Sequence, residues 1–474
     1  YPPITGFQTA SVGGEAVVRQ ISSGGYSLTL GVRPVSGGTD LAPTGASSTL
    51  PGAPSSPVMT DSTYRAGFGV LHGPGAAPDL ILEPRRTANG SVTSLDAGIL
   101  SPCAVQSRIV KCWGATGATG IVAQGFGPLS SHVPIAVKGI TTATAVAAGN
   151  DFACALLTDT TVKCWGNDSA GQRGNGAVVD ATNSAPTTVS GLTGVVQITA
   201  GLQFACARLD TGEVRCWGTE NDGELGNGGA LSSVATTPVA VVRTLADGVG
   251  TLTAISSIDA GPRHVCAITT SGAARCWGQD TYEQLGNGTG ATSSSRPVAV
   301  SLLSDVREIS AGATHTCARI GTGGVRCWGT DEKGETGDGG TIVAGARVAL
   351  PSVVVGISDA SSISAGIGTS CARLATTGQL RCWGDNQTGA IGDGTLVNRS
   401  SPAVVRRADG APLTAQSVSA GGLLTCSRSA TSTVQCWGYN VYGQTGNAYT
   451  RIADGTPRTV PNLDGTTFTI VPVP

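Results

Sequence analysis

Seven copies of one short motif constrain the fold of this chain more than any other feature. Each copy begins with Ala-Gly, places a cysteine five residues after the glycine, and ends about ten residues later with Cys-Trp-Gly. The copies recur every 51 to 60 residues and contain all 14 cysteines and all 7 tryptophans of the chain. A fixed internal pattern at this period predicts a ring or array of supersecondary units.

The two cysteines of each copy are placed to form a disulfide. In the third copy, Asp210-Thr211-Gly212 lies midway between two runs of alternating character, which predicts a β-hairpin. Folding about Thr211 sets Cys206 opposite Cys216, where Cβ atoms lie roughly 4.5–5.5 Å apart, close to what a disulfide needs. Zinc ligation and free thiols are the alternatives, but the sequence has no Cys-x-x-Cys and only four histidines. The predicted pairs are Cys103–Cys112, Cys154–Cys164, Cys206–Cys216, Cys266–Cys276, Cys317–Cys327, Cys371–Cys382 and Cys426–Cys436.

Each copy also provides about four short strands. A polar loop rich in Asn, Asp and Gly follows Cys-Trp-Gly, and a strand such as Pro297-Val298-Ala299-Val300 comes next. Four antiparallel strands make one blade of a β-propeller. We therefore predict a seven-bladed, all-β propeller with one tryptophan in the core of each blade, namely Trp113, Trp165, Trp217, Trp277, Trp328, Trp383 and Trp437.

The repeat resembles a known family. Ala260-Gly261, His264, Cys266-Ala267, Cys276-Trp277-Gly278 and Gln284-Leu285-Gly286-Asn287-Gly288 stand in the order of the regulator of chromosome condensation repeat. The resemblance covers about 80% of the chain and implies a seven-bladed propeller; secreted members of this repeat superfamily include inhibitor proteins. The paired cysteines depart from the nuclear pattern, and the first copy lacks the Gln-Leu-Gly-Asn-Gly loop after Trp113.

Composition narrows the class of partner and the compartment. The net charge of −2 gives no concentrated positive field for nucleic acid, and no apolar run approaches the 18 or so residues that span a bilayer. Paired cysteines are typical of oxidising surroundings outside the cytoplasm. The chain begins at Tyr1 rather than Met, from which we expect that a signal peptide has been removed.

The two ends of the chain differ from the repeats. Residues 1–90 are predicted to form a β-rich arm or small domain, rich in Gly, Ser and Pro, and residues 91–474 the propeller. Each blade needs one strand of the Pro-x-Val kind and one apolar strand before Ala-Gly. Counting these segments at both ends of the chain gives eight such sets for seven blades. One set would close the ring, and the other would cap an edge or pair with a neighbouring molecule. The residues proposed for assembly or ring closure are Leu80, Ile81, Leu82, Val92, Leu95, Val460, Phe468 and Ile470.

No catalytic or metal-binding pattern is evident. His264 and His315 stand two residues before a cysteine, where other copies have Phe152 or Phe204, which indicates packing rather than catalysis. The Asn, Asp and Gly loops could bind calcium, but turns that need positive φ explain the same composition. We expect no enzyme activity and no cofactor.

The leading hypothesis is a secreted or cell-surface structural protein. Its propellers would self-assemble through the N-terminal arm or the spare C-terminal strand into a filament or surface layer, so that its partners are copies of itself. The alternative is a monomeric secreted module that binds or inhibits another extracellular protein with one propeller face.

Overall fold

The computed structural model is all-β throughout the residues it describes. These are residues 91–115, 130–178, 185–243, 248–447, 453–460 and 463, together with the backbone of strands at 17–21, 25–29, 70–71, 80–86 and 466–472. Contacts divide the chain into two units, Gly90–Asp464 and Tyr1–Asn89 with Gly465–Pro474.

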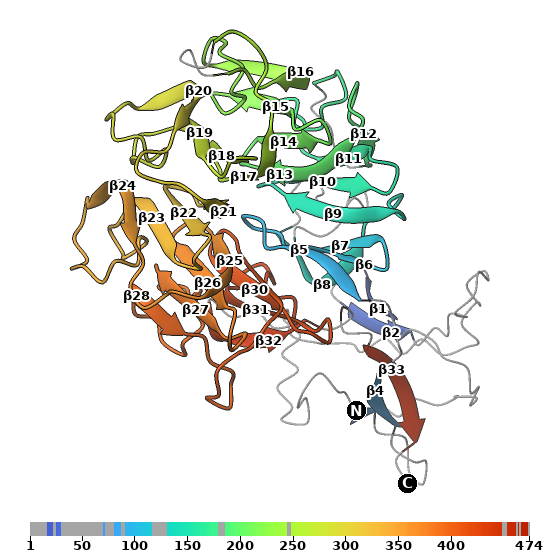
Figure 1. The fold of residues 1–474 in the computed structure, drawn as a ribbon. Coiled ribbons are helices and arrows are strands. Elements are labelled where there is room, and N and C mark those ends of the chain that lie inside the picture. The colour runs from blue at the N-terminus through green and yellow to red at the C-terminus, as the bar shows by residue number, and fades with distance from the viewer. Residues whose placement is uncertain are drawn as a thin grey trace. The chain divides into compact units, whose positions relative to one another are not determined.

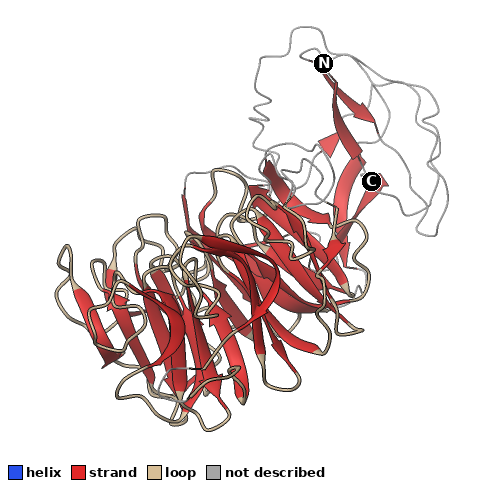
Figure 2. Ribbon diagram, turned by 90° about the horizontal axis from the view of Figure 1, so that it is seen from above, coloured by secondary structure: helices blue, strands red, loops and turns tan. Residues whose placement is uncertain are grey.

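The larger unit consists of seven four-stranded antiparallel sheets, which confirms the predicted propeller. In Figure 1 the first strands of the blades lie toward the middle of the ring and the fourth strands at its rim, and Figure 2 shows that strands make up the described structure. Blades 1 to 3 are β5 (Val92–Asp96), β6 (Cys103–Gln106), β7 (Ile109–Ala115), β8 (Ser130–Ala136); β9 (Ala143–Ala148), β10 (Phe152–Leu157), β11 (Val162–Gly166), β12 (Thr187–Thr188); and β13 (Val195–Ala200), β14 (Phe204–Leu209), β15 (Val214–Glu220), β16 (Ser233–Ala240).

Blades 4 to 7 repeat the same order. They are β17 (Ile255–Ala260), β18 (His264–Thr269), β19 (Ala274–Gln279), β20 (Ser293–Ala299); β21 (Val306–Ala311), β22 (His315–Ile320), β23 (Val325–Thr330), β24 (Arg347–Val353); β25 (Ala360–Ala365), β26 (Thr369–Leu374), β27 (Leu380–Gly384), β28 (Arg399–Val404); and β29 (Ser417–Ala420), β30 (Leu424–Arg428), β31 (Val434–Tyr439), β32 (Ala453–Thr459).

The disulfides staple the middle two strands of every blade. Cys206 of β14 stands directly opposite Cys216 of β15, and the same register recurs in the other six blades. All seven predicted pairs are bonded, with Cα atoms 4.0–4.1 Å apart. Every bridge therefore lies within a single blade, and its sulfur atoms are buried.

The hydrophobic core lies between blades rather than within them. Its buried residues form seven clusters, and each cluster joins one blade to the next. The cluster between blades 3 and 4, for example, combines Val214 and Leu225 with Val265 and Trp277. All seven tryptophans are fully buried, so each contributes its large apolar area to a joint with the preceding blade.

At the six joints whose loops are described, the loop of one blade contacts the tryptophan of the next. The indole nitrogen of Trp328 donates a hydrogen bond of 2.9 Å to the carbonyl of Gln284, in the loop of the preceding blade. Gly286, two residues on, has φ +67° and lies so close that a Cβ atom there would be 2.5 Å from Trp328 Nε1. The same bond is made by Trp113 to Gln444, Trp217 to Gln172, Trp277 to Glu224, Trp383 to Glu335 and Trp437 to Ala390.

Blade 7 closes the ring on blade 1 without sharing a strand. Every blade is one continuous stretch of chain, and the joint uses the same contacts as the others, with Trp113 donating to the Gln444 carbonyl. Val92 and Val460 are buried together in this joint, and Leu95 packs against them. The Gln106 side chain donates to the carbonyl of Leu463, which attaches the end of blade 7 to blade 1.

The strand segments left over from the blades pair with each other. In the smaller unit β4 (Leu80–Arg86) pairs antiparallel with β33 (Thr466–Pro472), and β3 (Val70–Leu71) adds to β4. Leu80, Ile81 and Leu82 thus lie in β4, and Phe468 and Ile470 lie in β33. Near the N-terminus β1 (Val17–Ile21) pairs antiparallel with β2 (Gly25–Thr29), and the rest of the predicted arm lies outside the described residues.

The outer strand of each blade carries a proline. Proline cannot donate to a neighbouring strand, so at a sheet edge it hinders pairing with another chain. The prolines are Pro134, Pro238, Pro297, Pro351, Pro402 and Pro457, and Pro186 directly precedes the short β12.

Substitution of two glycines in the blade 4 loop tests the contact between this loop and Trp328. Gly286→Ala and Gly290→Ala both place a side chain at positive φ, which costs about 1 kcal/mol. Only at Gly286 would the new methyl group meet Trp328, since no atom lies within 4 Å of a Cβ at Gly290. We expect Gly286→Ala to lose roughly 1–3 kcal/mol more than Gly290→Ala in denaturant unfolding of the oxidised protein. Equal losses would show that the Trp328 contact does not stabilise the joint.

Candidate functional site

The first strands of the blades line a channel through the ring, with a cavity of about 260 Å³. In six of the seven blades, the residue before Ala-Gly accepts a hydrogen bond, through its side-chain oxygen, from the backbone N–H of the alanine in the next blade. Ser419 does so for Ala97 at 2.9 Å, and thereby links blade 7 to blade 1. The other bonds are Asp96 to Ala148, Thr199 to Ala260, Asp259 to Ala311, Ser310 to Ala365 and Ser364 to Ala420. We call this ring of bonds the channel latch.

Two members of the channel latch are carboxyl groups. Burial raises the pKa of Asp259 to about 7, and it also raises the pKa of Asp96. No histidine, cysteine, lysine or arginine lies among the residues that line the channel. The charge of Asp96 raises the pKa of Asp259 further, and each of the two carboxyls also accepts a backbone hydrogen bond from the next blade.

His264 and His315 are buried at the joints between blades 4, 5 and 6. His264 Nε2 lies 2.8 Å from the hydroxyl of Thr316, which itself donates to the Gln284 carbonyl, so Nε2 carries the proton and donates. His315 Nε2 lies 2.7 Å from the Ser370 hydroxyl. Burial lowers the pKa of His264 to about 3 and that of His315 to about 4, so both are neutral at physiological pH.

Neighbouring blades match these histidines with hydroxyls. Where Phe204 replaces the histidine, the residue facing it from the next blade is Val265 rather than a threonine or serine. An apolar side chain therefore faces an apolar one, and a polar side chain faces a polar one, as expected of side chains that pack across a joint. This arrangement favours packing over catalysis for both histidines.

The two faces of the propeller differ in charge. Consecutive antiparallel strands reverse direction, so the turns after the first strand and the loops after the third strand share one face. We call this the loop face; it comprises residues 97–102, 149–151, 167–178, 185–186, 201–203, 221–232, 261–263, 280–292, 312–314, 331–346, 366–368, 385–398, 421–423 and 440–447. The opposite hairpin face holds the remaining described turns between strands.

The loop face is strongly acidic. Its loops have twelve carboxyl groups against three basic side chains, a formal net charge of −9, whereas the hairpin face has six against five, a formal net charge of −1. Five of the twelve are buried, namely Asp168, Glu224, Asp280, Asp331 and Glu335. The carboxylates are Asp151, Asp168, Asp222, Glu224, Asp280, Glu283, Asp331, Glu332, Glu335, Asp338, Asp385 and Asp393, and the basic residues are Arg173, Arg263 and Lys333. Burial raises the pKa of Glu224 to about 7 and that of Asp280 to about 6.

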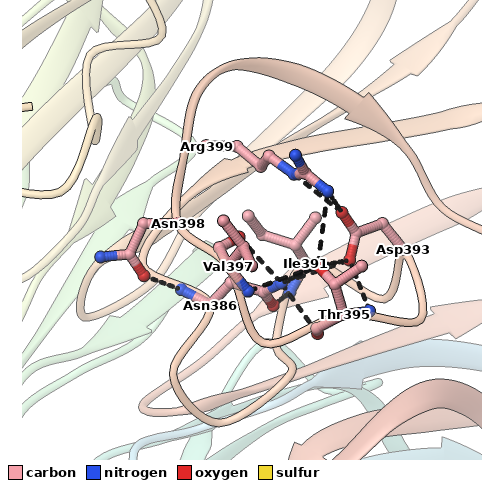
Figure 3. A network of polar contacts seen from close by, with 7 residues as sticks. All are labelled: Asn386, Ile391, Asp393, Thr395, Val397, Asn398 and Arg399. Atoms are coloured by element: carbon pink, nitrogen blue, oxygen red, sulfur yellow. Dashed lines mark hydrogen bonds and ion pairs between the residues drawn. The ribbon is translucent and has the colours of Figure 1, made fainter. Parts of the chain in front are cut away.

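The loops of this face are held by their own polar side chains, as Figure 3 shows for blade 6. The Asn386 amide accepts from the Ile391 N–H and donates to Asp393, Thr395 and the Val397 carbonyl. Arg399 binds the Asp393 carboxylate through two nitrogens, at 2.9 and 2.6 Å. These contacts use the Asn and Asp residues for structure, which accounts for the loop composition without calcium.

The braced loops carry apolar side chains into solvent. Leu396 and Val397, at the tip of the blade 6 loop, are 55% and 60% exposed. Exposed apolar side chains recur on the other loops of this face, at Val178, Leu231, Ile342, Val343, Val441 and Tyr442. Eight large apolar side chains are thus exposed on the loop face, against Val249, Leu302 and Val355 on the hairpin face.

No metal site or membrane-spanning helix is found where the chain is described. No group of three or more His, Cys, Asp and Glu side chains in that part is placed to hold a metal ion. No helix there is long and apolar enough to cross a bilayer. The 116–129 loop, where the first copy departs from the repeat, lies outside the described residues.

Fold and site together define this chain as a seven-bladed β-propeller with a disulfide in every blade. The regulator of chromosome condensation (RCC1) repeat matches residues 143–172, 195–224, 255–284, 306–335 and 360–390, and again 271–319. The chain belongs to the RCC1 repeat family. Propellers of this family are typically binding or regulatory proteins rather than catalysts.

Relatives with this repeat have diverse names. The chain is 25% identical over 315 residues to the human E3 ubiquitin-protein ligase HERC2, covering 65% of this chain and 6% of that protein. It is 26% identical over 316 residues to the ultraviolet-B receptor UVR8 of Arabidopsis thaliana, covering 64% and 66%. This chain thus spans a small part of the first relative and just under two thirds of the second.

Solved structures share the fold. Prp20p from Saccharomyces cerevisiae has a TM-score of 0.62 and 20% identity, over 80% of this chain and 88% of that one. Human WBSCR16 has a TM-score of 0.60 and 23% identity, over 73% and 87%. At these identities the likeness concerns the fold alone.

The channel latch has one gap, which gives a testable substitution. Blade 2 has Ala147 at the position that is Ser, Thr or Asp elsewhere, and alanine has no oxygen to accept from Ala200. Ala147→Ser should supply it and stabilise the protein by about 0.5–1.5 kcal/mol in denaturant unfolding. Ser419→Ala, which removes the bond to Ala97, should destabilise it by a similar amount. A destabilising Ala147→Ser would contradict the role assigned to the latch.

The buried histidines predict acid sensitivity. The pKa of both histidines is lower in the folded protein than in the unfolded chain, so only the unfolded chain binds protons at these histidines in mild acid. The free energy of unfolding therefore decreases as the pH falls below about 6.5. The double variant His264→Phe, Thr316→Val copies the Phe204–Val265 pair of the neighbouring joint. We expect it to lose about 1.4 kcal/mol less per pH unit than the native protein between about pH 6 and 4. Parallel stability curves for the two proteins would contradict this assignment.

Proposed function

We propose that this chain is an extracytoplasmic protein-binding module that binds its partner with the loop face. The observation that carries the proposal is the set of exposed apolar side chains on hydrogen-bonded loops, exemplified by Leu396 and Val397. Apolar groups at the surface gain free energy when a partner protein covers them. Loops on a rigid scaffold are also where propellers and other β folds usually place binding residues.

The seven disulfides support the proposed compartment. Bridges of this kind form and persist in secreted or cell-surface proteins, and are rare in the cytosol. With every cysteine bonded, the chain has no free thiol for redox or metal chemistry. This supports a role outside the cytoplasm.

The construction of the loops favours affinity. The Asn386 and Arg399 contacts fix the blade 6 loop before any partner arrives, so less conformational entropy is lost on binding. Lys333 of the blade 5 loop bonds to Asp385 at the base of the blade 6 loop at 2.6 Å, so the two loops are held together. The face therefore offers a preformed surface.

A second candidate function is self-assembly, and one observation favours it. β33 pairs with β4 along one side, and no strand pairs with its other side among the described residues. A copy of this chain could add a strand there. The prolines of the outer blade strands hinder lateral association of the blades themselves, so assembly would depend on β33.

The test is a pull-down of oxidised full-length protein from the medium surrounding its source cells. We expect the native protein to retain one foreign polypeptide in stoichiometric amount. Leu396→Asp, on the loop face, should abolish retention because it places a charge where apolar contact is needed. Leu302→Asp is the matched control, since Leu302 is exposed on the hairpin face.

Two results would contradict the proposed function. One is retention that is lost with Leu302→Asp and kept with Leu396→Asp. The other is the absence of a foreign partner together with a mass, by light scattering, that is a multiple of 47.0 kDa, which would favour self-assembly.

A further inference from the structure

The blade 4 loop departs from the other loops at one turn position. Blade 4 has Glu283 six positions after its tryptophan, and the backbone of Glu283 is left-handed, with φ +66°. A side chain strains the backbone in this region, where glycine is favoured. The turn alone therefore does not explain why a glutamate stands there. At the same position the other described loops have glycine with positive φ, namely Gly171, Gly223, Gly334, Gly389 and Gly443.

Asp280 shares this turn with Glu283 and is buried at its base. It is 1% exposed, and its Oδ1 accepts a hydrogen bond of 2.9 Å from the Leu285 N–H. Its second oxygen, Oδ2, is buried and receives no hydrogen bond from the described residues. A buried carboxylate oxygen without a donor is costly, because nothing replaces the water that it lost on folding.

Glu283 adds a second oxygen of the same kind. Its N–H donates to the Asp280 carbonyl at 3.0 Å, so the two residues are held in one turn. Its Oε2 is likewise buried and has no donor in the described part of the chain. Burial raises the pKa of Asp280, and the charge of Glu283 raises it further, as expected of carboxyl groups that lie close together. One turn thus buries two acceptor oxygens of like charge.

Blade 2 shows how a carboxylate at this position is otherwise neutralised. The residue that corresponds to Asp280 is Asp168, three positions after the tryptophan, and its Oδ2 accepts from Arg173 Nε at 3.0 Å. The chain itself therefore supplies a cation to Asp168. Blade 4 has Leu285 at the position of Arg173, and leucine cannot take that role.

Blade 6 shows which oxygens meet the same position. The corresponding residue is Asn386, and its amide nitrogen donates to the carbonyls of Thr395 and Val397 at 3.0 and 3.2 Å (Figure 3). In blade 4 residues 289–291 hold the corresponding positions, in a loop of equal length. A carboxylate in place of the amide turns acceptors toward acceptors, and a cation between them would satisfy both sides.

We propose that Asp280 and Glu283 bind a calcium ion in the blade 4 loop. Asp280 Oδ2 and Glu283 Oε2 supply the charged ligands, and backbone carbonyls of residues 289–291 together with water supply the others. Ca²⁺ accepts such mixed sets of six to eight oxygens in flexible geometry. Two carboxylates are few for a tight site, so we expect a dissociation constant of about 0.1–1 mM, as in extracellular modules. The inference does not depend on the proposed partner binding.

The site adjoins the joint between blades 4 and 5. Gln284 directly follows Glu283, and its carbonyl accepts from the Trp328 indole at 2.9 Å and from the Thr316 hydroxyl at 2.8 Å. A cation that fixes the backbone of Glu283 therefore also fixes the contact that holds the two blades. Because the ion binds the folded chain, it should raise the unfolding temperature.

The experiment titrates Ca²⁺ into oxidised full-length protein that has been dialysed against a chelator, at constant ionic strength. Calorimetry should show one site per chain. Thermal unfolding in about 10 mM Ca²⁺ should occur about 2–5 °C higher than in chelator.

Two variants copy natural counterparts of the site, so both are expected to fold. Asp280→Asn gives blade 4 the amide of blade 6, and Glu283→Gly gives it the glycine of the other loops. Each should weaken Ca²⁺ binding at least tenfold, because each removes one charged ligand. Asp331→Asn makes the same change at the corresponding position of blade 5 and should leave the affinity unchanged. In chelator, Glu283→Gly should unfold at no lower temperature than the native protein, since it relieves the strained backbone.

Three results would overturn the site. The first is native protein that neither binds Ca²⁺ nor unfolds at a higher temperature in about 10 mM Ca²⁺. The second is an affinity that both blade 4 variants leave unchanged. The third is equal weakening by Asp331→Asn, which would indicate diffuse attraction of Ca²⁺ to the loop face. The pull-down with Leu396→Asp is independent of all three, so the calcium site and the proposed function can fail separately.

Discussion

The structure depends on the contact between the loop of one blade and the buried tryptophan of the next. A single four-stranded blade has two apolar faces and cannot bury either alone, so it needs neighbours on both sides. The bond from Trp328 to the Gln284 carbonyl, with Gly286 lying against the indole, fixes how far apart and at what angle two blades sit. Repeated around the ring, this geometry leads blade 7 back to Trp113 and closes the propeller without a shared strand.

The same contact determines which residues of the loop have a structural role. The loop that reaches over the tryptophan must keep its glycines and its Asx and Gln residues, because these hold its backbone. Leu396, Val397, Ile342 and Val343 come after the glycines that lie against the tryptophans, Gly392 and Gly337, and their side chains are exposed. In each of these loops the first part therefore holds the joint between blades, and the later part exposes apolar side chains to solvent.

Much of the fold could be predicted from the sequence, because its determinants are local and repeated. The spacing of Cys206 and Cys216 about a turn is enough to place the two cysteines opposite each other. The channel latch could not be predicted, since it joins residues such as Ser419 and Ala97 that lie 322 positions apart. The alternation of Ser, Thr and Asp before Ala-Gly was its only signal. The excess of acidic residues on the loop face was likewise hidden, because basic residues elsewhere in the chain bring the net charge to −2.

The disulfides bear on how such a chain reaches its native state. Each bridge closes a stretch of only 9 to 11 residues, and none joins two blades. During oxidation a cysteine therefore has its correct partner much closer along the chain than any other cysteine outside its own hairpin. The shortest wrong pairing between neighbouring repeats, Cys276 with Cys317, would close a loop of 41 residues. With 14 cysteines, this locality lets each blade form its own bridge independently of the others, rather than through a search among many isomers.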